Sequence, residues 1–119
     1  MKKILVVEDN KTNMKLFCDI LEYKGYRVTK CYDGQEAYHM LQKETFDLVI
    51  LDIQLPMLDG FSLIKKLKKE NIEMPKIIVV SAFAMDKDKQ NAKMLGCQEY
   101  LTKPIDIMNF VSTVEKYTK

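Results

Sequence analysis

The sequence predicts an α/β fold in which a five-stranded parallel sheet is covered by helices on both faces. Five short apolar runs alternate along the chain with five segments whose apolar residues recur at helical spacing. Such alternation with short connections is typical of parallel sheets with right-handed crossovers. Two of the runs, 48–51 and 77–80, are apolar at every position, as expected of strands buried on both faces. For five strands the usual doubly wound order is 2-1-3-4-5, which gives a flavodoxin-like three-layer sandwich.

The first unit is a strand over Lys3 to Val7 followed by a helix over Asn10 to Lys24. Asp9 or Asn10 can cap the start of this helix, and Gly25 stands where a helix-ending glycine belongs. The apolar face of the helix is formed by Met14, Phe17, Cys18 and Leu21.

The second unit starts with a strand over Tyr26 to Cys31, which we expect nearer an edge of the sheet. Asp33 and Glu36 have the spacing of a capping box, with the aspartate in the cap position, so they predict the start of the next helix. The apolar stripe of that helix consists of Ala37, Met40 and Leu41.

The third unit contains the strand over Leu48 to Asp52, which ends abruptly in a carboxylate. Pro56 and Gly60 mark the following segment as a loop, and a helix begins near Gly60. Leu63, Ile64 and Leu67 form the apolar face of this helix. Its other face carries four lysines, which suit a solvated surface better than a docking patch for an acidic partner: Lys65, Lys66, Lys68 and Lys69.

The last two units are predicted from a strand over Ile77 to Val80 that ends at Ser81 and a short strand over Gln98 to Leu101. The helix between them, Met85 to Leu95, has the fewest apolar residues on one face, so we expect it to pack most loosely. The final helix has an apolar stripe at helical spacing, formed by Ile107, Val111 and Val114 with Phe110 beside them.

Composition excludes several classes of protein. At 119 residues the chain has the length of a single domain, which we expect to span residues 1–119. A formal net charge of +2 is too small to indicate binding to nucleic acid, and no apolar run approaches the length needed for membrane insertion. No signal peptide is evident. The three cysteines do not have the spacing of a metal site, so we expect them to be free thiols. Free thiols and the absence of a signal peptide are typical of a cytoplasmic protein, which is our expectation here. The default expectation is a monomer, or a weak dimer.

Acidic side chains follow two strands that are neighbours in the predicted sheet. Glu8 and Asp9 end the first strand, and Asp52 ends the third. Open parallel sheets bind ligands beyond the carboxyl ends of their strands at the switch point of the winding, which here lies between these two strands. Three carboxylates placed together repel one another unless a cation lies among them. Oxygen ligands of this kind suit Mg²⁺, for which Mn²⁺ can substitute. Zinc is disfavoured, because no His or Cys lies near this edge in the sequence.

Two further polar residues are predicted at the same edge. Ser81 ends the fourth strand and Lys103 follows the fifth, and a hydroxyl and a cation are what a phosphoryl group needs. A carboxylate beside Mg²⁺ can accept a phosphoryl group and become an aspartyl phosphate. Each residue taken singly also suits a structural role: Glu8 and Asp9 as helix caps, Ser81 as a turn cap and Lys103 as a loop lysine.

Over essentially its whole length the chain closely resembles the receiver domain of bacterial two-component response regulators. The resemblance rests on several motifs: Val7-Glu8-Asp9-Asn10, Leu51-Asp52 with Pro56, Asp59 and Gly60, Val80-Ser81-Ala82, and Tyr100-Leu101-Thr102-Lys103-Pro104. It implies that Asp52 is the phosphoacceptor, and that Glu8, Asp9, Asp52 and the backbone carbonyl of Gln54 hold Mg²⁺. It also implies that Ser81 and Lys103 bind the phosphoryl group, and that the bond before Pro104 is a candidate for the cis form.

The resemblance also implies a switch and a set of partners. Ser81 and Tyr100 occupy the positions of the switch residues, so phosphorylation is expected to alter the face formed by the fourth helix, the fifth strand and the fifth helix. The phosphoryl donor would be a histidine kinase or a histidine phosphotransfer protein. Output is expected through contact with a downstream protein, because no output domain follows residue 119. His39, the single histidine, is expected on the solvent side of the second helix rather than in a phosphorelay.

Some motifs resemble a narrower group, the stand-alone receivers of the DivK type, which implies control of cell-cycle or polarity kinases. Glu8 in place of the commoner first aspartate is a departure that implies one metal contact through water. The motifs that carry this resemblance are Glu8-Asp9-Asn10, Asn13-Met14-Lys15-Leu16-Phe17, Asp52-Ile53-Gln54-Leu55-Pro56, Ala82-Phe83-Ala84-Met85 and Gly96-Cys97.

Other functions remain as alternatives. A phosphorelay intermediate that passes the phosphoryl group to a histidine phosphotransferase, or an adaptor that works without phosphorylation, would use the same fold. An aspartate-nucleophile phosphatase is disfavoured, because Gln54 stands two residues after Asp52 where those enzymes usually carry a second aspartate. An FMN protein is disfavoured because carboxylates occupy the place of a phosphate cradle. We therefore expect a binding protein whose chemistry is limited to its own phosphorylation and dephosphorylation, rather than an enzyme.

Overall fold

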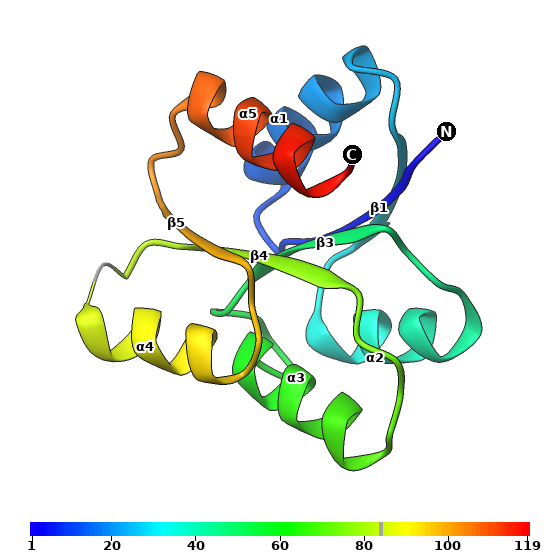
Figure 1. The fold of residues 1–119 in the computed structure, drawn as a ribbon, viewed down its shortest axis with the longest axis vertical. Coiled ribbons are helices and arrows are strands. Elements are labelled where there is room, and N and C mark those ends of the chain that lie inside the picture. The colour runs from blue at the N-terminus through cyan, green and yellow to red at the C-terminus, as the bar shows by residue number, and fades with distance from the viewer. Residues whose placement is uncertain (84) are drawn as a thin grey trace.

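The structure is a computed structural model that describes residues 1–83 and 85–119; Ala84, which belongs to one of the motifs above, lies outside the described residues. Its sheet has five parallel strands in the order β2-β1-β3-β4-β5, as the sequence predicts. Figure 1 shows the sheet between two helical layers, with α1 and α5 on one face and α2, α3 and α4 on the other. The elements in chain order are β1 Lys3–Val7, α1 Lys11–Tyr23, β2 Arg27–Cys31, α2 Gly34–Lys43, β3 Leu48–Asp52, α3 Gly60–Lys69, β4 Lys76–Ser81, α4 Asp86–Met94, β5 Glu99–Thr102 and α5 Ile107–Tyr117.

The core is divided by the sheet into two apolar layers, because successive strand residues point to opposite faces. In β3, Leu48 and Ile50 belong to the layer under α1 and α5, whereas Val49 and Leu51 belong to the layer under the other three helices. All five residues of β3 are buried, including Asp52. The central strand is therefore a rigid support for the carboxylate at its end.

Helix starts follow the caps that the sequence indicates. The side chain of Asn10 accepts a hydrogen bond from the Asn13 amide, and that of Asp33 accepts one from the Glu36 amide. Gly25 adopts a positive φ of 92° just after α1, in the conformation that favours glycine. Only Ala92 of α4 is buried, which confirms the expectation that this helix packs most loosely.

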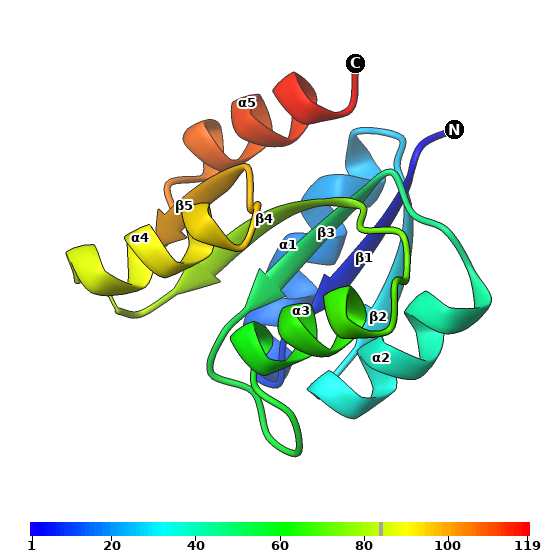
Figure 2. The same ribbon diagram turned by 60° about the horizontal axis from the view of Figure 1, so that its bottom comes forward.

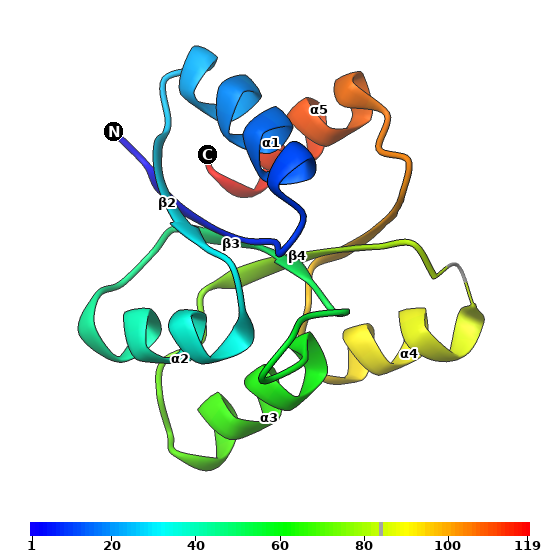
Figure 3. The same ribbon diagram turned by 180° about the vertical axis from the view of Figure 1, so that it is seen from behind.

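The prediction for the last helix was partly wrong. Phe110 and Val114 are fully buried as expected, but Ile107 is 50% exposed and Thr113 takes a place in the buried face instead. Ile107 is the first residue of α5, one turn before Phe110, whose ring stacks on that of Phe17 in α1. Figure 3 shows α5 and α1 on the same face of the sheet. Apolar spacing indicates the face of a helix, but it does not show at which turn contact with the core begins.

Two other features of the chain are as expected from its sequence. His39 is exposed on α2, and Cys18 and Cys31 are buried free thiols with Cys97 half-buried. Within the residues that the structure describes, no helix is both long enough and apolar enough to cross a bilayer.

The loop between β3 and α3 extends beyond the sheet (Figure 2) and ends at Asp59, the cap of α3. The Asp59 carboxylate accepts hydrogen bonds from the amide and the hydroxyl of Ser62, at 2.9 and 2.8 Å. Partial burial works to raise the pKa of Asp59, but these bonds, a third from the Phe61 amide and attraction by Lys65 outweigh it. The pKa therefore lies below its usual value.

Asp59→Ala should lower the free energy of unfolding by about 1 kcal/mol at pH 7, the usual loss for an N-cap. Because the folded pKa is depressed, the contribution of the carboxylate is complete above the unfolded pKa and is lost as the pH falls through the folded value. Urea unfolding at pH 7 and at decreasing pH measures the difference between the two proteins. Asp59→Asn, which keeps a capping oxygen, serves as the control, and a difference for Asp59→Ala that is unchanged in acid would contradict the assignment.

Candidate functional site

The carboxyl edge of the sheet brings together the three acids that the sequence singles out. Val7 of β1 lies opposite Leu51 of β3, so the residues that follow them meet at the same edge. Ligand atoms of Glu8, Asp9 and Asp52 all lie within 4.8 Å of one another. Glu8 is 1% exposed and Asp52 is 3% exposed, whereas Asp9 faces solvent. The donor set consists of oxygen atoms alone, so it fits a hard divalent cation better than zinc.

Lys103 provides the positive charge at this edge. Its Nζ lies 2.8 Å from Asp52 Oδ2 and 2.8 Å from Glu8 Oε1, so one ammonium group joins the two buried carboxylates. Burial works to lower the pKa of Lys103, but the hydrogen bonds to Asp52 and Glu8 and the attraction of both charges raise it above its usual value. Lys103 is therefore a full cation at neutral pH.

Backbone amides complete the contacts of the buried carboxylates. Glu8 Oε2 accepts a hydrogen bond from the Asn10 amide at 3.0 Å, and Asp52 Oδ1 accepts one from the Gln54 amide at 2.9 Å. Burial raises the pKa of Glu8 even though hydrogen bonds from Lys103 and Asn10 oppose the shift. Gln54 itself is exposed, in the turn that directly follows β3.

Gly60 lies directly against the backbone of Asp52 and Ile53, where no larger residue fits. A Cβ atom there would lie 2.7 Å from Ile53 Cα and 2.9 Å from the backbone oxygen of Asp52. The start of α3 thus packs directly against the backbone that carries Asp52, which holds the end of β3 in place.

Ser81 and Tyr100 are linked through the backbone of Phe83. The Phe83 amide donates a hydrogen bond to Ser81 Oγ at 3.1 Å, and the Phe83 carbonyl accepts one from the Tyr100 hydroxyl at 2.9 Å. Ser81 is fully buried, and its own carbonyl accepts a hydrogen bond from the Lys103 amide at 2.7 Å. Burial is the largest cause of a raised pKa for Tyr100. The peptide bond between Lys103 and Pro104 is cis.

The structure brings the predicted metal and phosphoryl ligands to one edge of the sheet, whereas Tyr100 lies within β5 and reaches the loop after β4 only through its hydroxyl. Sequence reasoning missed two connections there, the Lys103–Glu8 ion pair and the use of the Phe83 backbone between Ser81 and Tyr100. Neither has a local pattern in the sequence, because a backbone contact carries no residue preference and the ion pair joins positions 95 residues apart.

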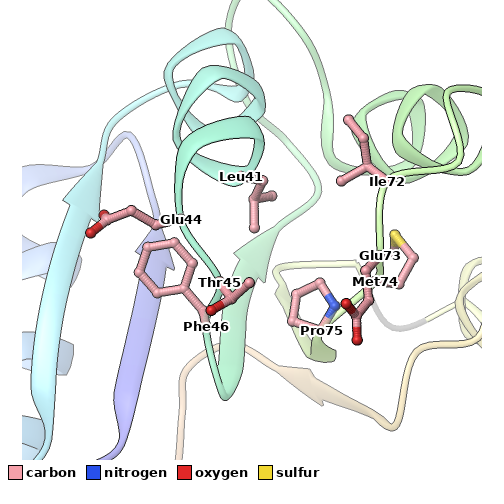
Figure 4. Close-up of a pocket in the computed structure, with 8 residues that line it drawn as sticks. All are labelled: Leu41, Glu44, Thr45, Phe46, Ile72, Glu73, Met74 and Pro75. Atoms are coloured by element: carbon pink, nitrogen blue, oxygen red, sulfur yellow. The ribbon is translucent and has the colours of Figure 1, made fainter.

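A hollow of about 230 Å³ lies away from this edge and contains none of the predicted site residues. Its wall is mainly apolar, with Leu41 and Phe46 on one side and Ile72, Met74 and Pro75 on the other (Figure 4). It is formed by the end of α2 and the connections that lead into β3 and β4. The hollow therefore lies near the amino ends of β3 and β4, opposite the edge that carries Glu8, Asp9 and Asp52.

A comparison with protein families shows to which family the chain belongs. Residues 4–115 match the model of the response regulator receiver domain. The chain belongs to this family. Receiver domains are parts of two-component signalling proteins, and a curated relative is consistent with that role. The polar-differentiation response regulator DivK of Brucella ovis is 38% identical over 117 residues, which cover 98% of this chain and 95% of the relative.

Solved receiver domains have the same fold. The receiver domain of a Francisella response regulator superposes with a TM-score of 0.92 at 31% identity, covering 99% of this chain and 97% of the other. The receiver domain of a sensor histidine kinase from Pseudomonas aeruginosa PAO1 superposes with a TM-score of 0.87 at 31% identity, covering 98% of this chain and 97% of the other. That structure contains a magnesium ion coordinated in its active-site cleft.

Proposed function

We propose that residues 1–119 act as one receiver domain in which Asp52 accepts a phosphoryl group from a histidine kinase or a histidine phosphotransfer protein. The observation that carries this proposal is the environment of Asp52. It is a nearly buried carboxylate that accepts a hydrogen bond from Lys103 and has two further carboxylates within 4.8 Å. In the transfer, a bond forms between an Asp52 oxygen and phosphorus while the N–P bond of the phosphohistidine breaks, and the released imidazole nitrogen takes up a proton.

Mg²⁺ is the proposed cofactor, with Mn²⁺ as a substitute. Glu8, Asp9 and Asp52 would hold it through their carboxylates and Gln54 through its backbone carbonyl. Bound there, the ion would supply charge neutralisation for the phosphoryl oxygens. The oxygen-only donor set supports this assignment, as does the magnesium ion in the related Pseudomonas receiver domain.

Ser81 and Lys103 are the proposed ligands of the phosphoryl group. The Lys103 ammonium already contacts Asp52, so it can stay beside the acceptor and pair with a phosphoryl oxygen. The Ser81 hydroxyl can donate a hydrogen bond to a second oxygen. Ser81 Oγ accepts a hydrogen bond from the Phe83 amide, so a movement of Ser81 toward the phosphoryl group would pull on the loop before α4.

The proposed output surface is the face formed by α4, β5 and α5. The hydrogen bond from Tyr100 to the Phe83 carbonyl connects β5 with the same loop, and α4 has a single buried residue to resist a shift. Phosphorylation would therefore change this surface with little work against the core. A downstream protein would recognise the altered face, and the DivK relative makes kinases of cell polarity or the cell cycle the first candidates.

The remaining parts of the proposal concern the molecule in the cell. The protein would act in the cytoplasm as a monomer or a weak dimer, as a signalling protein rather than an enzyme with an external substrate. Its catalysis would be limited to its own phosphorylation and dephosphorylation.

The proposal is tested by incubating the protein with acetyl phosphate and Mg²⁺ and measuring its intact mass. The wild type should gain one phosphoryl group, and Asp52→Asn should gain none. Asp59→Asn is the matched control, since it removes an exposed acid from the same loop but keeps the helix cap; this variant should be modified like the wild type. A chelator of divalent cations should suppress modification of the wild type. Modification of Asp52→Asn at the rate of the wild type would refute the assignment of the phosphoacceptor.

A further inference from the structure

The Lys103 ammonium is shared between two carboxylates that belong to the proposed metal site. Its Nζ lies 2.8 Å from an oxygen of Glu8 and 2.8 Å from an oxygen of Asp52. The second oxygen of Glu8 is held by the Asn10 amide at 3.0 Å. Both carboxylate oxygens of Glu8 therefore already accept a hydrogen bond, and one of the two donors is the positively charged ammonium group of Lys103.

The length of the Glu8 side chain is what allows this contact. Glu8 follows β1, whereas Lys103 follows β5, and two strands of the sheet lie between them. An aspartate at position 8 would end about 1.5 Å earlier, the length of one carbon–carbon bond. With Lys103 held by Asp52, the contact of 2.8 Å between the acid at position 8 and Lys103 Nζ would lengthen beyond a hydrogen bond. A shorter acid would keep its negative charge, but it would bind the lysine less closely as long as the ammonium group stays at Asp52.

We infer that Lys103 competes with the divalent cation for Glu8, so that the Glu8–Lys103 ion pair lowers the metal affinity of this site. The inference rests on the proposed function, because it concerns the cation that Glu8, Asp9 and Asp52 would hold. A cation that binds Glu8 must either displace the lysine from Oε1 or tolerate its charge nearby, and both lower the affinity.

A cation that displaces Lys103 from Glu8 leaves the lysine with its other partner. Lys103 has a second partner in Asp52, so a lysine that leaves Glu8 stays at the proposed phosphoacceptor. Occupation of the metal site would thus direct the ammonium group toward the place where a phosphoryl oxygen arrives. Glu8 acts in this scheme as a positioning residue for Lys103 as well as a metal ligand.

The test is a double-mutant cycle on metal binding, measured by Mn²⁺ titration with electron paramagnetic resonance detection of the free ion. In the wild-type background, Lys103→Met should tighten Mn²⁺ binding by about tenfold or more, the value of one charge-assisted hydrogen bond. Glu8→Asp alone should also tighten binding, and Lys103→Met in the Glu8→Asp background should add clearly less than it does to the wild type. Lys116→Met, which removes an exposed lysine that lies 3.6 Å from Glu99, should leave the affinity unchanged.

The outcomes distinguish this inference from the function on which it rests. Equal effects of Lys103→Met in both backgrounds, or weaker binding in Glu8→Asp, would overturn the competition while leaving the metal site intact. Mn²⁺ binding that persists unchanged in Asp52→Asn and in Asp9→Asn would instead overturn the metal site itself. Circular dichroism confirms the fold of each variant, and Glu8→Asp decides the question alone if Lys103→Met does not fold.

Discussion

Lys103→Met should lower the free energy of unfolding by about 3–5 kcal/mol at pH 7 in a buffer without divalent cations, the usual loss when one partner of a buried ion pair is removed. Glu8 and Asp52 have side chains only 1% and 4% exposed. In the part of the chain that the structure describes, Lys103 is the only cation in contact with either of them. Its removal leaves two buried carboxylates beside each other, and chemical denaturation in urea measures the loss.

The pH dependence of this loss has a defined sign. The raised pKa of Lys103 means that its contribution is complete below the unfolded value of about 10.5 and is lost only as the pH rises through the folded value. The full loss is therefore expected at pH 7. It should shrink in acid, because burial raises the pKa of Glu8 and protonation of this side chain removes one of the uncompensated charges.

Two further variants show whether charge is the cause. Glu8→Gln in the Lys103→Met background should recover part of the stability, because one of the two uncompensated charges is gone. Lys116→Met serves as a surface control, since Lys116 and Glu99 are 65% and 36% exposed and such pairs contribute about 0–1 kcal/mol. Equal losses for Lys103→Met and Lys116→Met would contradict the view that the buried pair neutralises the site.

Phe110→Ala should lower the free energy of unfolding by about 3–5 kcal/mol, the range measured for large aromatic residues in cores. Phe110 is fully buried, and its ring centroid lies 5.1 Å from that of Phe17. The substitution opens a cavity between α5 and α1 and removes a stacked aromatic pair that holds the two helices on one face of the sheet. Urea unfolding followed by circular dichroism measures the change.

Ile107→Ala provides the matched control on the same helix. Ile107 lies one turn earlier and is 50% exposed, so its truncation should change the stability by no more than about 0.5 kcal/mol. The difference between the stability losses of Phe110→Ala and Ile107→Ala tests whether Ile107 belongs to the buried face of α5, as the sequence predicted, or lies outside it, as the structure shows. A loss at Ile107 as large as that at Phe110 would favour the sequence-based face.

The architecture was predictable because its signals are local. Apolar runs such as 48–51 and 77–80 identify central strands, and Asn10 and Asp33 mark helix starts through their own capping bonds. The position of the acids followed from topology, since the carboxyl ends of neighbouring parallel strands must meet at one edge. These inferences need only periodicity and strand order, which a single sequence contains.

The finer features of the site depend on the reach of side chains between distant elements. The sequence indicates a lysine near the acids, but the distance from Glu8 Oε1 to Lys103 Nζ depends on how far apart β1 and β5 lie and on the length of a glutamate. The exposure of Ile107 likewise depends on how the first turn of α5 packs on the rest of the molecule. Both are properties of the packed molecule, so periodicity alone could not reveal them.

Ser81 and Tyr100 are both hydrogen-bonded to Phe83, and both bonds involve only the backbone of Phe83, its amide and its carbonyl. Any amino acid with a backbone N–H can occupy position 83 without breaking either hydrogen bond, and proline is the one residue that removes the donor. The exposed ring of Phe83 takes no part in either hydrogen bond, so its replacement leaves both in place. The surface of this loop can therefore be altered by substitution while the connection between β4 and β5 through the Phe83 backbone stays in place.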